Sequence, residues 1–403
     1  MTTINSPVVT SPYKPPFDDA EFARRLAAVK QRMSDRGIDL LLIADPANMN
    51  YLTGYDGWSF YVHQMVAVAL EAEQPMWIGR RQDAPGARES TWLDDGEIVG
   101  YPDHYVHSTE RHPMEFVARV MVDRGWAKGT VAVESDAYYY TAAADAALRR
   151  GLPNCRFVDA ALLVNWVRAI KSEAEIALMR QAARIAEQAM QTAVDVIAPG
   201  VRQCDAVAEI TAAQIRGLPE FGGEYAAIVP LLPTGTASAA PHLTWTDRPF
   251  ESGAGTIIEL AGCRRRYHCP MARTVYLGTP PQKWHDLAEM VVEGIGYALE
   301  AAKPGNTCAD IEAAWRKALE PTGLVKESRL GYPTGVNYPP DWGEHTMSLR
   351  PGDSTVLQPN MTFHLIPGMW LDDWGIEISE CIRITETGAE PFCGFDRRLF
   401  VRE

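Results

Sequence analysis

The sequence has 403 residues, 46% of them hydrophobic and 22% charged, which predicts a globular protein with more than one core. Its formal net charge of -14, from 38 basic and 52 acidic residues, argues against nucleic acid as a partner. No apolar run is long enough to predict a membrane span, and the first residues lack the pattern of a secretory signal, so we expect a cytoplasmic protein.

Cysteine usage gives a second limit on the class of protein. The seven cysteines are an odd number and are scattered without a C-x-x-C pair, which predicts buried reduced thiols. Five residues separate Cys263 from Cys269, and this is not a standard spacing for zinc ligands. The cysteines therefore predict neither disulfides nor a zinc site.

The first part of the chain predicts an arm followed by an α/β domain. Residues 1–18 are rich in Pro, Ser and Thr, and we expect them to form a flexible arm. The next apolar residues are spaced as on one face of a helix: Phe22, Leu26, Val29 and Met33. Short β runs such as "MVAVALEA" and "TVAVES" then alternate with helical stretches, so residues 19–165 are predicted to be an α/β domain.

A long amphipathic helix opens the second predicted domain, residues 166–403. Ser172 and Glu175 have the spacing of a capping box at its start. Further helices follow, together with the strands "TIIELAG" and "HCPMARTVYLG", which are joined by a basic elbow at Arg264–Arg266. Helices that segregate from a largely antiparallel sheet indicate an α+β fold.

Short strings spread over nearly the whole chain carry a family resemblance. They are "DPANMNYLTGY", "AIKSEAEIALMRQAARIAEQAM", "APHLT", "IIELAGCRRRYHCPMARTVYLG", "LQPNMTFHLIPGMW" and "GIEISECIRIT". In this order they resemble the creatinase/prolidase/methionine aminopeptidase family. The resemblance implies an α/β creatinase-type N-terminal domain followed by an α+β catalytic domain of the pita-bread fold.

The metal-ligand positions of that family are altered in this chain. The family's metallohydrolases hold two divalent ions with two Asp, one His and two Glu residues. The corresponding residues here are Glu259, Pro270, Tyr332, Ile366 and Ser379. Because Pro270 and Ile366 have no side-chain donor, the resemblance implies an enzyme that uses no metal ion and no other cofactor.

Two stretches, "ELAGCRRRYHCPMARTV" and "YPPDWGEHTMSLR", resemble a metal-independent branch of the family. Members of this branch hydrolyse ectoine, a six-membered cyclic amidine that carries a carboxylate. The resemblance implies that ectoine, and also 5-hydroxyectoine, is opened to N-acetyl-2,4-diaminobutyrate. It further implies a homodimer.

Two residues are candidates for the catalytic steps. Glu259 is the one carboxylate kept among the family's ligand positions, in an otherwise apolar run. The amidine carbon C2 lies between two nitrogens that share a positive charge, so Glu259 can attack it as a nucleophile or deprotonate an attacking water. His242 matches a family histidine that transfers protons near the substrate, and would protonate the departing ring nitrogen.

Six further residues are candidates for binding the substrate. Strand alternation puts Glu377 on the side of Ser379 and Glu380 on the opposite side, and a structural role is the alternative for each. Arg266 offers a guanidinium to the substrate carboxylate, although a solvated turn is the alternative. Tyr332 and His364 are expected to line the pocket. Trp58 is expected to close the pocket of the other subunit.

Other functions remain open at this point. A metal-dependent prolidase or aminopeptidase, or a dimethylsulfoniopropionate lyase, is opposed by Pro270 and Ile366. Charge complementarity cannot distinguish a creatinase from an ectoine hydrolase, since the substrate of creatinase is also a small cation with a carboxylate. A binding protein with an inactive site is opposed by the retention of Glu259 and His242.

Overall fold

The structure, a computed structural model, describes residues 13–403. The chain divides into two units, one up to Val167 and one from Arg168. Residues 1–12 of the predicted arm lie outside the described residues. In the described part of the arm, the Lys14 ammonium donates a hydrogen bond to the Arg88 carbonyl oxygen over 3.1 Å, which ties this segment to the N-terminal unit.

A six-stranded mixed sheet forms the centre of the N-terminal unit. Its strand order is β4-β3-β2-β1-β5-β6, with β1–β2 and β2–β3 antiparallel and the other pairs parallel. The strands are β1 (Leu40–Ile43), β2 (Met65–Ala69), β3 (Met76–Arg80), β4 (Ile98–Tyr101), β5 (Thr130–Val133) and β6 (Arg156–Asp159).

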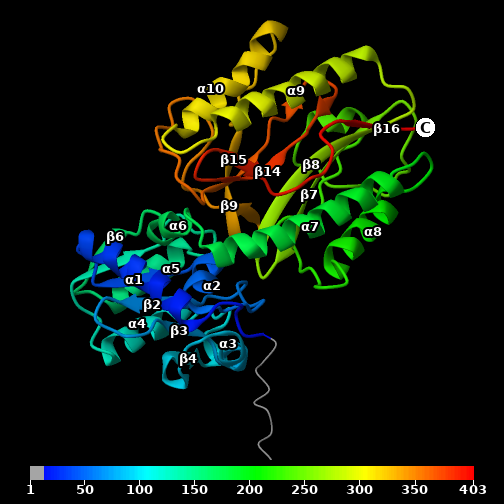
Figure 1. The fold of residues 1–403 in the computed structure, drawn as a ribbon. Helices are drawn as coiled ribbons and strands as arrows, with labels where there is room; N and C mark the ends of the chain where they lie inside the picture. Colours follow the sequence, from blue (N-terminus) through cyan, green and yellow to red (C-terminus); the bar gives the residue numbers. More distant parts are fainter. Residues whose placement is uncertain (1–12) are drawn as a thin grey trace, which may run out of the picture. The chain divides into compact units, whose positions relative to one another are not determined.

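Helices surround this sheet and bury their apolar faces on it (Figure 1). They are α1 (Asp19–Asp35), α2 (Pro46–Thr53), α3 (Ala84–Ser90), α4 (Pro113–Asp123), α5 (Ala142–Gly151) and α6 (Leu163–Arg168). The start of α1 is fixed by Asp18, whose side chain accepts a hydrogen bond from the Glu21 backbone N–H. The predicted stripe on α1 is confirmed, because Phe22, Leu26 and Met33 are buried.

The second unit is built on an eight-stranded sheet. Six strands follow in the order β15-β14-β11-β9-β8-β16, with β7 paired to β8 and β10 paired to β9. A separate ribbon joins β12 to β13. The strands are β7 (Gly255–Arg264), β8 (Tyr267–Leu277), β9 (Gly331–Tyr338), β10 (Asp341–Gly343), β11 (Thr362–Leu365), β12 (Met369–Trp370), β13 (Gly375–Ile376), β14 (Glu380–Ile384), β15 (Ala389–Pro391) and β16 (Leu399–Arg402).

Four helices cover this sheet, and Figure 1 shows α7 and α8 (green) beside β7 and β8, with α9 and α10 (yellow) on the other side. They are α7 (Glu173–Val196), α8 (Gln203–Arg216), α9 (Gln282–Ala301) and α10 (Cys308–Leu319). The capping box predicted at Ser172 and Glu175 is present at the start of α7. In the part of the chain that the structure describes, no helix combines the length and the apolar character needed to cross a bilayer.

The hairpin of β7 and β8 packs closely against α7. A Cβ atom at Gly262 would lie 1.9 Å from the Ala182 carbonyl oxygen, so only glycine lets helix and strand approach this closely. The predicted basic elbow contracts to a two-residue turn, Arg265 and Arg266, since Arg264 and Tyr267 still pair across the strands. Both turn residues have positive φ, 50° and 67°, as type I′ turns require.

The cysteines agree with their prediction. All seven are free, and five of them are buried. Three of the buried thiols come together where β8 meets β14, with 3.7 Å between the sulfur atoms of Cys269 and Cys393 and with Cys381 beside them. Burial raises the pKa of the Cys269 thiol well above its usual value and also raises the pKa of the Cys381 thiol, so these two sulfurs are protonated packing groups.

Candidate active site

Glu259 lies near the middle of β7 with its side chain almost wholly removed from solvent, 5% exposed. Its backbone N–H and C=O are both hydrogen-bonded to Leu231, on the edge of β7 that does not pair with β8. This stretch of β7 is therefore hydrogen-bonded on both edges. Burial, and then the negative charge of Asp341, raises the pKa of the Glu259 carboxyl to about 8. Glu259 is therefore mostly protonated near neutral pH in this environment.

A second carboxyl, Glu377, faces the same region from the segment after β13. It is fully buried, and neither carboxyl oxygen has a hydrogen-bond partner among residues 13–403. Burial, and then the charge of Glu259, raises its pKa well above the usual value. Two buried carboxyls that both resist ionisation form a site that a bound cation would stabilise.

One lysine opposes this pair of acids. Lys326 lies between α10 and β9 and is buried. Burial lowers its pKa to about 8, and the charge of Glu377 acts in the opposite direction. Sequence reasoning missed Lys326, because nothing in the local string "LVKESRL" distinguishes it from a surface lysine.

Tyr332 and His364 belong to a continuous hydrogen-bonded chain. They are opposite each other on β9 and β11, and the Tyr332 hydroxyl is 3.0 Å from His364 Nδ1. The Trp342 indole N–H donates to the same hydroxyl over 2.8 Å, and His364 Nε2 is 2.7 Å from the Ser379 hydroxyl oxygen. That hydroxyl oxygen also accepts from the Ala272 backbone N–H. Burial lowers the pKa of His364 to about 3, so the chain is neutral.

These side chains do not suit the pair of divalent ions that the family fold implies. Tyr332 and Ser379 offer only neutral hydroxyls, and both are already bonded to His364. Pro270 and Ile366 have no donor atom, which leaves Glu259 as the one carboxylate of the five positions. Within residues 13–403 no group of three or more His, Cys, Asp or Glu side chains has a metal-binding arrangement.

The structure does not bring all predicted site residues to Glu259. His242 lies in the loop after the short 3₁₀ helix Gly235–Ala239; it is exposed and has no hydrogen bond to any other residue between 13 and 403. Trp58 belongs to the N-terminal unit and is 60% exposed, with its ring 4.8 Å from that of Phe60. The roles assigned to both residues stay predictions.

Arg266 has partners of its own at the end of the hairpin. Its guanidinium is 3.0 Å from the Glu224 carboxylate and lies 3.6 Å from the centre of the Tyr225 ring. Arg264, beside the turn, is five positions along the strand from Glu259, a distance of about 17 Å at 3.3 Å per residue. These contacts favour a structural role in the turn over a role at the substrate carboxylate. The turn is not solvated at this residue as the alternative expected, because the Arg266 side chain is only 4% exposed.

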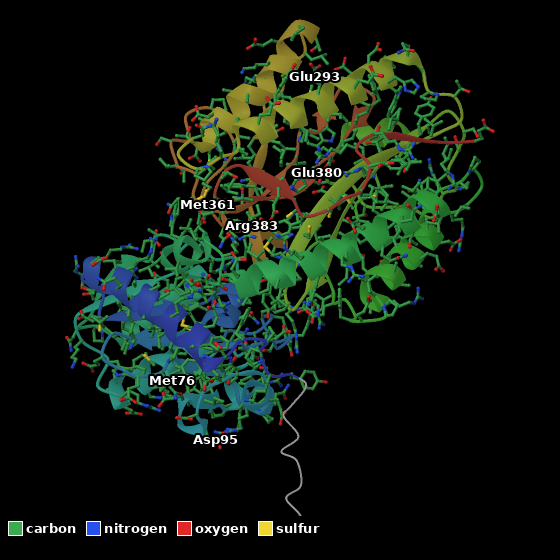
Figure 2. All side chains as sticks on the ribbon, in the orientation of Figure 1. Met76, Asp95, Glu293, Met361, Glu380 and Arg383 are labelled. Carbon is green, nitrogen blue, oxygen red and sulfur yellow. The ribbon has the colours of Figure 1, made fainter. Side chains whose placement is uncertain are left out.

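Glu380 is likewise paired inside the protein. Its position on β14 is marked in Figure 2, and one carboxyl oxygen contacts Arg273 at 2.8 Å and Arg397 at 3.0 Å. Both Glu380 and Arg273 are buried, so removing either would leave a buried charge uncompensated. The structural alternative therefore fits Glu380 better than substrate binding.

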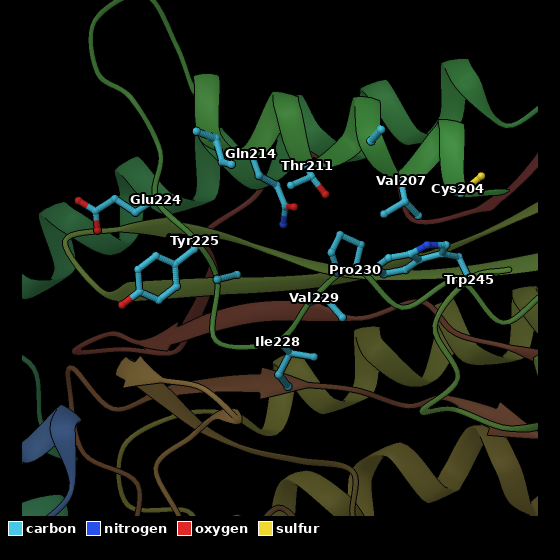
Figure 3. A pocket seen from close by; sticks show the side chains of 13 residues that line it. Cys204, Val207, Thr211, Gln214, Glu224, Tyr225, Ile228, Val229, Pro230 and Trp245 are labelled. Carbon is cyan, nitrogen blue, oxygen red and sulfur yellow. The ribbon is translucent and has the colours of Figure 1, made fainter. Parts of the chain in front are cut away.

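A cavity of about 470 Å³ lies elsewhere in the catalytic unit, between α8 and the segment 224–230. Figure 3 shows Val207 and Gln214 of α8 on one side and Tyr225, Ile228 and Pro230 on the other. Its lining is mainly apolar and does not include Glu259 or Glu377. The cavity is therefore distinct from the acidic site.

Known protein families match both units. Residues 25–170 match the creatinase/prolidase N-terminal domain, and residues 177–386 match metallopeptidase family M24. The chain is 52% identical to ectoine hydrolase of Halomonas elongata, over 96% of this chain and 98% of that protein. It is 49% identical to an uncharacterised hydrolase/peptidase of Sinorhizobium fredii, over 96% and 99% of the two chains.

Solved structures agree on the fold. The dipeptidase PepE of Mycobacterium ulcerans superposes with a TM-score of 0.77 at 24% identity, over 96% of this chain and 99% of that one. A prolidase of Thermococcus sibiricus gives a TM-score of 0.81 at 19% identity, over 94% and 99%. The predicted family and fold class are thereby confirmed. The chain belongs to the creatinase-type hydrolases of family M24, with a creatinase/prolidase N-terminal domain before a pita-bread catalytic domain.

Proposed function

We propose that this protein hydrolyses ectoine to N-acetyl-2,4-diaminobutyrate, and also 5-hydroxyectoine to the corresponding hydroxylated product. The identity of 52% to the Halomonas elongata ectoine hydrolase, over nearly the full length of both chains, supports this substrate. The observation that carries the proposal is the buried carboxyl pair, Glu259 and Glu377: burial raises the pKa of both carboxyls, and the charge of Glu259 raises the pKa of Glu377 further. A cationic amidinium is the kind of ligand that such a pair favours.

Glu259 acts on C2 of the amidinium ring. As a nucleophile, its carboxylate oxygen forms a bond to C2, one C2–N bond breaks, and water then displaces the carboxylate to leave the acetamide. As a base, Glu259 takes a proton from a water whose oxygen adds to C2 before the same C2–N bond breaks. Either route adds one water across the bond. The bound amidinium favours ionised Glu259, which both routes need.

His242 is proposed to protonate the departing ring nitrogen. This role rests on the match of "APHLT" to the family motif. Tyr332 and His364 line the substrate side of the site as a neutral hydrogen-bonded pair, which adds no charge to compete with the cation.

The reaction is proposed to need no metal ion. The donor set supports this, since four of the five family ligand positions lack a carboxylate or imidazole. Dialysis against a chelator, with metal analysis of the protein, tests the point. Activity that falls on chelation and returns with a divalent ion would refute it.

Assembly and location are also proposals. We expect a cytoplasmic homodimer in which the loop 54–61, with Trp58 exposed on it, closes the site of the other subunit. An exposed tryptophan is suited to covering a delocalised cation.

The experiment that tests the function is incubation of purified protein with ectoine, without added metal, followed by NMR of the products and by intact-mass measurement. We expect ring-opened N-acetyl-2,4-diaminobutyrate, no turnover of creatine in the same assay, and no product with Glu259→Gln. Absence of ring-opened product from ectoine with the unaltered protein would refute the proposal. A mass increase on Glu259 would distinguish the nucleophilic route from the base route.

A further inference from the structure

Lys326 is a buried lysine to which the proposed chemistry gives no role. Its ammonium donates hydrogen bonds to the Ser328 hydroxyl at 2.8 Å and to the Gly368 carbonyl oxygen at 2.6 Å. It also lies 4.7 Å from the centre of the Trp370 ring. An ammonium has three donors, and the two hydrogen bonds use two of them on neutral oxygen atoms.

Gly368 places this ammonium close to Glu377. The carbonyl oxygen of Gly368 accepts from Lys326, while a Cβ atom at Gly368 would lie 3.2 Å from Cγ of Glu377. Lys326 and Glu377 therefore flank the same residue. They nevertheless form neither a hydrogen bond nor an ion pair, and both carboxyl oxygens of Glu377 lack a partner among residues 13–403.

A buried lysine and a buried glutamate that approach without pairing are costly for a fold, because each charge is removed from water without a direct partner. A purely structural pair would be expected in contact, as Arg273 and Glu380 are at 2.8 Å. A ligand that carries both a negative and a positive group would satisfy Lys326 and Glu377 together. Ectoine is such a zwitterion, since its carboxylate is attached to the ring carbon next to an amidine nitrogen.

We propose that Lys326 binds the carboxylate of the substrate and thereby selects carboxylated cyclic amidines over plain ones. The inference rests on the proposed ectoine hydrolysis. Glu377 holds the amidinium, Lys326 holds the carboxylate, and this fixes the ring so that C2 faces Glu259. The Trp370 ring, 4.7 Å from the ammonium, restricts where the carboxylate can approach.

Arg329, whose charge acts on Tyr332 and His364, is a second basic residue near the site and provides the internal comparison. Its guanidinium donates to the Ser348 hydroxyl at 3.2 Å and lies 4.4 Å from the centre of the Tyr332 ring. It is half-buried, whereas Lys326 is buried. The structure thus assigns the carboxylate to Lys326 and not to Arg329.

The test compares ectoine with 2-methyl-1,4,5,6-tetrahydropyrimidine, the same cyclic amidine without the carboxylate. For Lys326→Met we expect kcat/KM on ectoine to fall by about 30- to 100-fold, the value of one charge-assisted hydrogen bond, with about threefold change or less on the carboxylate-free ring. Lys326→Arg should restore part of the loss on ectoine. Lys317→Met, an exposed lysine of α10, serves as the matched control with no effect on either substrate.

The outcomes separate this inference from the proposed function. If the unaltered protein does not open ectoine, the function and the inference both fail. If it does, an equal loss on both substrates for Lys326→Met would assign the lysine a structural role and overturn the inference alone. An ectoine-specific loss for Arg329→Met in place of Lys326→Met would overturn it as well. Thermal melting of each variant identifies any loss that comes from unfolding.

Discussion

At the scale of single residues, the site is governed by the competition between burial and charge. Glu259 and Glu377 are both deprived of water, and each carboxyl is less easily ionised because of another acid nearby. Glu259 is affected by Asp341, whose own charge is held by a hydrogen bond to His345 at 2.7 Å. The protonation state of Glu259 is therefore adjustable from a residue that need not touch the substrate.

The pH profile follows from this arrangement. Because both proposed routes need Glu259 as a carboxylate, and burial raises its pKa to about 8, kcat/KM should rise with pH between 6 and 8. Asp341→Asn removes a negative charge that raises this pKa, so the acidic limb should move to lower pH. Steady-state kinetics across pH 5.5–9 with both proteins provides the measurement. An acidic limb at the same pH in both would contradict this account.

Glu377 should limit stability at alkaline pH. Its pKa in the folded protein is raised above the ordinary 4.5, so its contribution to stability is complete below that value and is lost as pH rises through the folded pKa. Glu377→Gln removes the titration. We expect similar melting temperatures at pH 5 and a value a few degrees higher for the variant at pH 8.5. Glu300→Gln, an exposed acid on α9, should show no such difference.

Some of this site could be predicted from the sequence and some could not. The run "TIIELAG" identifies Glu259 because one acid stands among buried apolar residues of a strand. Tyr332 and His364 are 32 positions apart in the sequence, and their contact depends on the pairing of β9 with β11. No local sequence pattern encodes this pairing. Lys326 was missed for the same reason, since its burial is created by Gly368 and Trp370, far along the chain.

At the scale of elements, the hairpin of β7 and β8 is the scaffold of the site. It carries Glu259, and its outer face is fitted to α7 at Gly262. The sequence predicted both strands and the capped helix correctly, because their signals are local. It did not predict that β16 joins β8 as a parallel neighbour, or that the arginine turn has only two residues, since partner choice is set by the whole sheet.

Gly262→Ala should therefore disrupt the packing of helix on hairpin. A Cβ there would come within 1.9 Å of Ala182 and 2.6 Å of Ala186 backbone atoms, so α7 must move. We expect a loss of about 1–3 kcal/mol in the free energy of unfolding. Gly296→Ala in α9, where a Cβ meets nothing within 4 Å, should be neutral or slightly stabilising. Equal melting temperatures for the two variants would contradict the packing argument.

At the scale of the whole molecule, the two units divide the proposed work. The C-terminal unit contains the acids, the lysine and the neutral hydrogen-bonded chain, whereas Trp58 belongs to the N-terminal unit. Control of access to the site is the role proposed for the loop 54–61 of the N-terminal unit. The order of the domains could be predicted from the sequence, and the family resemblance also predicts that the loop serves the other subunit.

Complementation between subunits tests this division. Trp58→Ala and Glu259→Gln should each be weakly active or inactive as pure proteins. In a coexpressed mixture, dimers that combine one chain of each kind have one intact site, so activity should return to about a quarter of the unaltered level. No recovery, with dimers verified by light scattering, would show that Trp58 does not serve the other subunit.

The neutral chain from Trp342 through Tyr332 and His364 to Ser379 also constrains how this sequence can evolve. A carboxylate restored at Pro270 or Ser379 alone would add a third acid near Glu259 and Glu377, and at Ser379 it would also break the bond to His364. One such change would still leave too few ligands to hold a cation. Each single substitution is therefore unfavourable. A dinuclear metal site could arise from this donor set only through several substitutions made together.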